Sequence, residues 1–86
     1  MKLKKEFVVH RSAQEAMLVP TGAADFAGMI MGNASFGTIL SLLGEDTTER
    51  DIVSAMCGLY DVMEDVVAGD VKAVLAQLRE IGALEE

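Results

Sequence analysis

Apolar positions between residues 65 and 84 recur with the period of an α-helix. The positions follow steps of four, three, four and three residues, and they are Val67, Val71, Val74, Leu78 and Ile81. Side chains at this spacing share one face of a helix, and Leu75 widens that face towards a second side. Gly82 is expected to end the helix, because glycine adopts positive φ without steric cost. The pattern predicts a long amphipathic helix at the end of the chain.

Two extended segments near the start of the chain predict a β-hairpin. Residues 6–11 and 16–20 are rich in aromatic and β-branched residues, which favour strands. A polar turn over residues 12–15 joins them, and Pro20 closes the second because proline cannot donate to a ladder. We expect these two strands to pair with each other.

A third, shorter strand is predicted at residues 28–32. Met29 and Met31 should share one face and Ile30 the other, because side chains alternate along a strand. The strand is therefore apolar on both sides. The loop before it is small and polar apart from Phe26, which we expect to anchor the loop to the core.

Two shorter helices are predicted between this strand and the long helix. Asn33 is a suitable N-cap for a helix that runs to about Leu43 and ends at Gly44. Thr48 and Asp51 form an aspartate version of a capping box before the next helix. The inward faces are expected to comprise Phe36, Ile39, Leu40 and Leu43 in the first helix, and Ile52, Met56, Leu59 and Tyr60 in the second.

The element order β-β-β-α-α-α predicts a small α+β domain. A three-stranded antiparallel sheet followed by three helices also describes a winged helix-turn-helix. The chain has 86 residues, of which 51% are hydrophobic, so we expect one globular domain over residues 1–86. No segment approaches the roughly 20 apolar residues of a membrane span, and none resembles a signal peptide. These features predict a soluble, cytoplasmic protein that does not associate with membranes.

The charge of the chain is −7 and is unevenly distributed. The first eleven residues carry four bases and one acid, a net charge of +3, so the remainder carries −10. Residues 45–70 alone hold eight acids against Arg50. Such a surface repels phosphate backbones, whose neutralisation supplies most non-specific nucleic-acid affinity. The charge predicts a basic partner and no nucleic-acid binding.

The residues that carry catalysis in other proteins are scarce in this chain. His10 and Cys57 are its only histidine and cysteine, which together make an incomplete set for a metal site or a nucleophilic pair. We expect His10 on the wet side of a strand. Cys57 is interpreted as a small buried hydrophobic residue, with a partly exposed thiol as the alternative. The prediction is a protein without catalytic residues, metal or cofactor.

The third strand suggests a surface for binding peptides. If it lies at the edge of the sheet, its free amides and carbonyls can accept another extended chain. The long helix beside it would supply an apolar wall, and the flexible thioethers of Met29 and Met31 suit varied partners. Asp70 sits beside the apolar stripe, where it either has a local partner or contacts a bound ligand.

Several short motifs along the chain resemble one known family. They are Val19-Pro20-Thr21-Gly22, Phe26-Ala27-Gly28-Met29-Ile30, Asn33 with Gly37, Ile39 and Leu43, Thr48 with Asp51-Ile52, Tyr60-Asp61-Val62, Asp70-Val71, and Leu78 with Gly82-Ala83-Leu84. Their order and spacing resemble the PqqD family, coenzyme PQQ synthesis protein D, whose fold is also called the RiPP recognition element. The resemblance extends from about Phe7 to Leu84. Gly32 departs from it, since the family usually has leucine there.

The resemblance implies a non-catalytic peptide chaperone. Members of the family bind the leader of a ribosomally made precursor peptide and present it to a modifying enzyme, often a radical SAM maturase. The leader adds as a strand to the third strand and lies beside the third helix. Carried onto this sequence, the peptide-binding candidates are Gly28, Met29, Ile30, Met31 and Gly32 on the strand, and Asp70, Val71, Val74, Leu75 and Leu78 on the helix.

Other functions remain open from the sequence. A winged-helix transcriptional regulator or a protein-protein adaptor has the same helix content, but a DNA-recognition helix requires outward-facing bases. The last helix offers only Lys72 and Arg79 among several acids. A free sheet edge could also pair with a second copy, which would give a homodimer.

Overall fold

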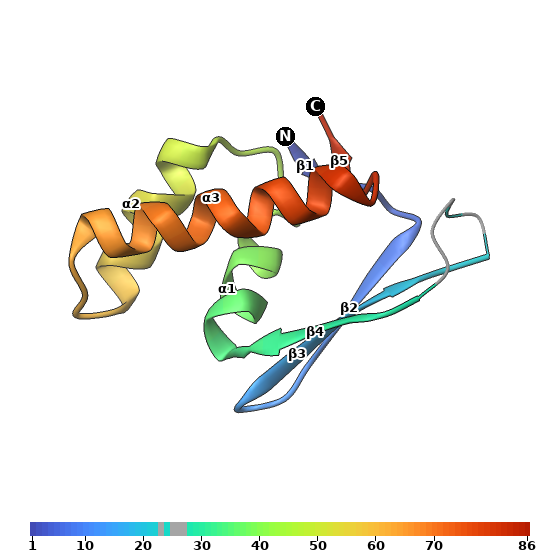
Figure 1. The fold of residues 1–86 in the computed structure, drawn as a ribbon, viewed down its shortest axis with the longest axis horizontal. Coiled ribbons are helices and arrows are strands. Elements are labelled where there is room, and N and C mark those ends of the chain that lie inside the picture. Colours follow the sequence, from blue (N-terminus) through green and yellow to red (C-terminus); the bar gives the residue numbers. More distant parts are fainter. Residues whose placement is uncertain (23, 25–27) are drawn as a thin grey trace.

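A three-stranded antiparallel sheet and a layer of three helices make up the molecule (Figure 1). The computed structural model describes residues 1–22, 24 and 28–86. Strands β2 (Phe7–Arg11), β3 (Glu15–Pro20) and β4 (Ile30–Asn33) lie in that order across the sheet. The α+β class, the hairpin and the third strand predicted from the sequence are confirmed. The anchoring role predicted for Phe26 lies outside the described residues.

Strand β4 is shifted relative to its predicted range of 28–32. Its ladder with β3 runs from the Leu18–Ile30 pair to the Glu15–Asn33 pair. Gly28 has φ +147°, outside the conformations of a strand, so pairing starts after it. Asn33 is extended, with φ −82° and ψ −174°, so the ladder continues up to the first helix.

The predicted alternation of side chains along β4 is confirmed. Ile30 packs at the margin of the core, and Met31 on the opposite face is 60% exposed. Met29, which precedes the strand, is 54% exposed. Gly32 lies opposite Ala16 on the inner face, where the Phe36 ring of the following helix packs directly against its backbone. This contact leaves no room for a side chain at position 32.

The helices are α1 (Ala34–Leu42), α2 (Glu49–Leu59) and α3 (Glu64–Glu80). Asn33 caps α1 by accepting a 3.0 Å hydrogen bond from the Phe36 amide, and Thr48 caps α2 through the Asp51 amide. Gly82, at φ +73°, ends α3 as predicted. The Ala83 amide donates to the Leu78 carbonyl at 2.8 Å, which is the bond that closes a Schellman motif.

The core lies between the sheet and the helices, and most of its predicted members are buried. The buried helical residues are Phe36, Ile39, Leu40, Leu43, Ile52, Val53, Met56, Val67, Val71, Leu75 and Leu78. The prediction that Leu59 is buried is wrong, because it is 64% exposed. It ends α2 at the far tip of the molecule, beyond α1 and the sheet (Figure 1). Tyr60 is partly buried but lies after the helix rather than in it.

A polar cluster joins β2, α1 and the end of α2. The Thr38 and Tyr60 hydroxyls are 2.8 Å apart, and Arg11 donates to Thr38 at 3.2 Å and to Ser41 at 2.8 Å. A Cβ at Gly37 would lie 2.7 Å from the Arg11 Nε, so the absence of a side chain there lets Arg11 cross α1. Thr38 is the one buried polar residue in the described core. These hydrogen bonds satisfy its hydroxyl group.

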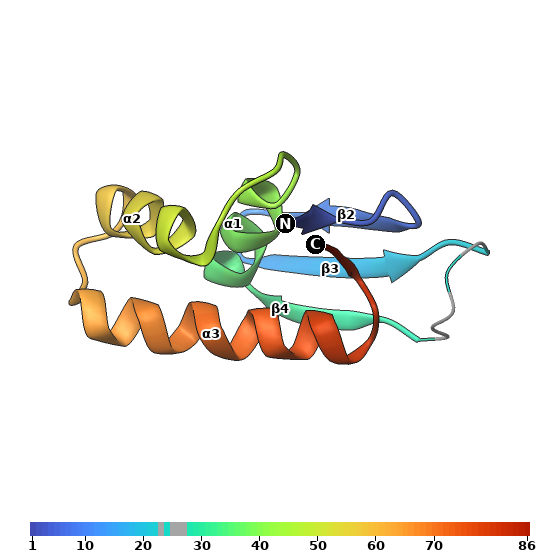
Figure 2. The same cartoon turned by 90° about the horizontal axis from the view of Figure 1, so that it is seen from above.

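A second, two-stranded sheet joins the ends of the chain, and the sequence pattern did not predict it. Strand β1 (Lys2–Leu3) pairs antiparallel with β5 (Leu84–Glu85), so the two termini lie side by side (Figures 1 and 2). Backbone hydrogen bonds from Leu3 to Leu43 and from Lys4 to Ala83 extend this connection.

The contact between Gly32 and Phe36 gives a first prediction. In Gly32→Ala, the new Cβ would lie 2.4 Å from Phe36 Cδ2 and 2.7 Å from its Cβ, so the ring and the start of α1 must shift. We expect a loss of about 1–3 kcal/mol in the free energy of unfolding, measured by urea denaturation. Gly69→Ala is the matched control, because open space surrounds that exposed helical position. It should gain about 0.5–1 kcal/mol, and equal effects of the two substitutions would contradict the prediction.

Candidate functional site

The outer edge of β4 is free in the described part of the chain. β4 pairs with β3 on one side, and no described strand pairs with it on the other. Half of the backbone amides and carbonyls of an edge strand point away from its neighbour. The predicted position of the third strand at the margin of the sheet is therefore confirmed.

Helix α3 runs along the β4 side of the molecule, in the layer that covers the sheet (Figures 1 and 2). Its Glu64 and Ala68 border a hollow shared with α2, so this flank of α3 faces α2. At 100° per residue, Asp70, Val74 and Gln77 fall on the opposite flank, which is turned towards the β4 side. We call Asp70, Val74 and Gln77 the β4-side flank of α3.

Burial separates the helix candidates into two groups. Val71, Leu75 and Leu78 are each 0% exposed and pack in the core. Val74 is partly buried at the margin of the core, and Asp70 is exposed. The centre of the buried face is therefore Val71 and Leu75, and Val74 lies at its edge, whereas the sequence pattern had placed Leu75 to one side. Only Asp70 and Val74 among the five candidates offer side chains to a ligand.

Gln77 was not among the predicted site residues, although it lies on the β4-side flank and is exposed. Its spacing was the available signal, because it follows Asp70 by seven residues and Val74 by three, which are the separations of neighbours on one helical face. The predicted site residues instead followed the apolar stripe of the helix, most of which packs in the core.

Asp70 supplies negative charge to this region. It makes no side-chain hydrogen bond or ion pair with any other described residue, so its carboxylate is available to solvent. The nearest base on the helix, Lys72, points to the other flank, and Arg79 is paired with Glu86 at 3.1 Å. That ion pair raises the pKa of Arg79. An exposed carboxylate attracts cationic groups.

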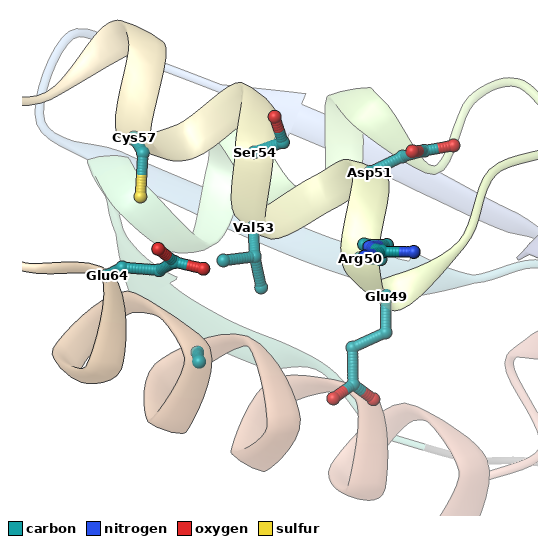
Figure 3. A pocket seen from close by; sticks show the side chains of 8 residues that line it. Glu49, Arg50, Asp51, Val53, Ser54, Cys57 and Glu64 are labelled. Carbon is teal, nitrogen blue, oxygen red and sulfur yellow. The ribbon is translucent and has the colours of Figure 1, made fainter.

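A separate hollow lies between α2 and α3 (Figure 3). It has a volume of about 700 Å³, and Val53, Cys57 and Glu64 point into it. Cys57 is partly exposed, so the interpretation of it as fully buried is wrong, and the alternative of a partly exposed thiol is confirmed. His10 is exposed on its strand, as expected.

The described residues contain no group of three or more histidine, cysteine, aspartate or glutamate side chains placed to hold a metal ion. Over the same part of the chain, no helix combines the length and the apolar character needed to cross a bilayer.

Comparison with known proteins identifies the family. A family model described as coenzyme PQQ synthesis protein D (PqqD) matches residues 15–84. The chain belongs to the PqqD family. The resemblance noted in the sequence is thus confirmed for this PqqD-family chain, and the match includes β4 and the whole of α3. No curated sequence matches the chain significantly.

Two solved structures share the fold of this PqqD-family chain. One is TbiB1 in complex with the TbiA(beta) leader peptide, with 26% sequence identity and a TM-score of 0.75 over 99% of this chain and 100% of that chain. The other is lasso peptide synthetase B1 complexed with the leader peptide, with a TM-score of 0.74 over 99% of this chain and 96% of that chain. The second is 18% identical, so it supports the fold alone.

The burial of α3 gives a second prediction. Leu75→Asp or Val71→Asp places a carboxylate where the wild-type side chain is fully enclosed, so we expect either variant to unfold. The milder Leu75→Ala should lose about 2–5 kcal/mol of stability in a denaturant titration. Asp70→Ala, on the exposed flank, should stay within about 0.5 kcal/mol of wild type. A folded Leu75→Asp variant would show that this position is not part of the core.

Proposed function

We propose that this domain, residues 1–86, binds the leader of a ribosomally synthesised precursor peptide. The observation that carries the proposal is the free edge of β4 beside the β4-side flank of α3. It is supported by the similarity to TbiB1, a protein solved in complex with a leader peptide. An extended peptide that adds to β4 would satisfy the outward amides and carbonyls of that strand.

The leader would occupy β4 as a fourth strand of the sheet. β4 has four residues, which at about 3.4 Å each span about 13 Å, so the recognised segment has about four to six residues. Alternate side chains of the leader would face the two sides of the sheet. One row would extend the outer face beside Met31, and the other would approach Ile30 and the β4-side flank of α3.

In this proposal, some residues of α3 contact the leader and others only support the helix. Val74 supplies apolar contact area and Asp70 attracts a lysine or arginine of the leader. Val71, Leu75 and Leu78 support the helix from the core and do not touch the peptide. On β4 and in the two residues before it, Met29 and Met31 adapt to leader side chains, while Gly28, Ile30 and Gly32 contribute backbone and inner-face packing. An interface of this size lies at the low end of specific interfaces, and we expect affinities from about tens of nanomolar to micromolar.

The domain would act in the cytoplasm as a non-catalytic chaperone for a separate modifying enzyme, such as a radical SAM maturase. Binding at β4 holds the leader and leaves the rest of the precursor free for that enzyme. The proposal requires no cofactor on this chain, because holding the leader makes and breaks no covalent bond.

Titration of isotope-labelled protein with the leader of a neighbouring precursor tests this function by NMR. Chemical shift changes should concentrate at residues 28–33 and along Asp70, Val74 and Gln77. Val74→Lys should weaken leader binding at least about tenfold, because it replaces apolar contact area with a charge that repels a basic leader.

Val8→Lys is the matched control for that substitution, because Val8 is an exposed valine on β2, the opposite edge of the sheet. It should bind the leader as wild type does, and circular dichroism should show both variants folded. Equal loss of affinity in the two variants, or shift changes confined to β2, would refute binding at β4.

Salt should weaken leader binding. Asp70 is exposed, and the chain carries a net charge of −7, so a basic leader gains long-range attraction that ions screen. We expect the affinity measured by fluorescence anisotropy to fall about tenfold between about 50 and 500 mM salt. The decrease should be smaller for Asp70→Asn. A salt-independent affinity would contradict the electrostatic part of the proposal.

A further inference from the structure

A second exposed surface lies at the far tip of the molecule, where a turn connects α2 to α3 (Figures 1 and 2). It contains four large apolar side chains within eight residues, with exposed fractions of 64% for Leu59, 47% for Val62, 70% for Met63 and 54% for Val66. We call these four residues the turn patch. Isolated exposed apolar residues are common, but a cluster of this kind usually marks an interaction surface.

Acidic residues surround the turn patch. Asp61, Glu64 and Asp65 are all exposed beside it, and residues 51–71 contain no lysine or arginine. The hollow between α2 and α3 includes Glu64 beside the turn patch and extends to Glu49, Arg50 and Asp51 at the start of α2 (Figure 3). Carboxylates alone therefore flank the turn patch along the chain, and the nearest base in the adjoining hollow is Arg50, at the start of α2. Charge of this kind selects partners.

The charge excludes several occupants of the turn patch. A second copy of this chain would bring an equally acidic rim against the first, and like charges in an interface cost free energy. Anionic lipid surfaces and nucleic acids are repelled for the same reason. The remaining occupant is a protein surface with an apolar centre and a rim of lysine and arginine.

The leader does not reach this surface when it is bound at β4. Met63 precedes α3 and Val74 lies eleven residues along the chain, so at about 1.5 Å per residue the two sites are roughly 16 Å apart along the helix. β4 lies beside the other half of α3, away from the turn (Figure 2). One helix thus carries two separate surfaces.

We infer that the turn patch docks the peptide-modifying enzyme, through a basic-rimmed apolar surface on that enzyme, while β4 holds the leader. This inference rests on the proposed function. It assigns the chain two independent interfaces, so the domain brings the enzyme and its substrate together by binding both at once. The effective concentration of the leader at the enzyme rises accordingly.

The test uses the purified modifying enzyme encoded beside the precursor gene, with its affinity for the full chain measured by interferometry. Met63→Asp and Leu59→Asp should each weaken enzyme binding at least about tenfold and leave leader affinity unchanged. Aspartate suits position 63 structurally, because Met63 is the N-cap of α3 and makes no capping hydrogen bond. The fold of that variant should therefore be preserved.

A charge-matched pair tests the acidic rim. Asp61→Lys should weaken enzyme binding at least about fivefold, whereas Glu45→Lys, an identical charge change at an exposed position in the turn between α1 and α2, should not. An equal loss of enzyme affinity in the two variants would show that the net charge of the chain, and not the acidic rim of the turn patch, affects enzyme binding.

Three other results would overturn the inference. They are wild-type enzyme affinity in both apolar variants, loss of leader binding in Met63→Asp, and a wild-type dimer in sedimentation that Met63→Asp makes monomeric. A wild-type chain that binds the leader but not the enzyme would also overturn it, with the proposed function intact. A chain that does not bind the leader would refute the proposed function instead, whatever its affinity for the enzyme.

Discussion

The contact between the Phe36 ring and the backbone of Gly32 holds the edge strand to the helical layer, and the candidate site depends on it. β4 has four residues and one neighbouring strand, so its own ladder could not fix its position firmly. The Asn33 cap joins β4 directly to α1, and Phe36, one turn later, folds back over the strand. The edge is thereby positioned in the free protein, so β4 itself loses less conformational entropy when another strand adds to it.

The same contact explains why glycine suits position 32. A leucine at position 32 would occupy the space of the Phe36 ring, so glycine and phenylalanine here form a compensating pair. The inner face of β4 is consequently flat next to Ala16. In the proposed function, a leader added to this edge would meet backbone at position 32 and side chains at Ile30 and Met31, which would favour a larger leader side chain opposite the glycine.

Local patterns in the sequence predicted most of the fold, because caps, glycine stops and apolar periods act over a few residues. Asn33, Thr48 and Gly82 marked helix boundaries correctly, since each satisfies backbone groups within one turn. The pairing of β1 with β5 joins residues some eighty positions apart, and no local pattern encodes it. Leu59 has the right period for a buried face, but the period does not reveal that no element lies beneath the last turn of α2.

The candidate site was predicted only in part for a related reason. A helical period of about 3.6 identifies a face, but it does not divide that face into its centre and its margins. Val71, Leu75 and Leu78 proved to be the centre, and Val74 the margin, because the position of α2 fixes the rotation of α3 about its axis. The sequence located the edge strand to within two residues at its start and one at its end, since the predicted range was 28–32 and the strand is Ile30–Asn33.

Helix α3 is longer than covering the sheet requires, and its length has a structural consequence. Its second half lies beside β4, and its first half continues with α2 beyond the sheet to the tip of the molecule (Figure 2). Val67 and Val71 in this half are enclosed in the core, whereas Val66 and the N-cap Met63 lie outside that buried face and remain exposed. Their exposure carries a cost in solubility that surrounding carboxylates offset. In the docking proposed above, an acidic rim around exposed apolar residues would keep the surface available to a basic partner, because like charges disfavour contact between two copies.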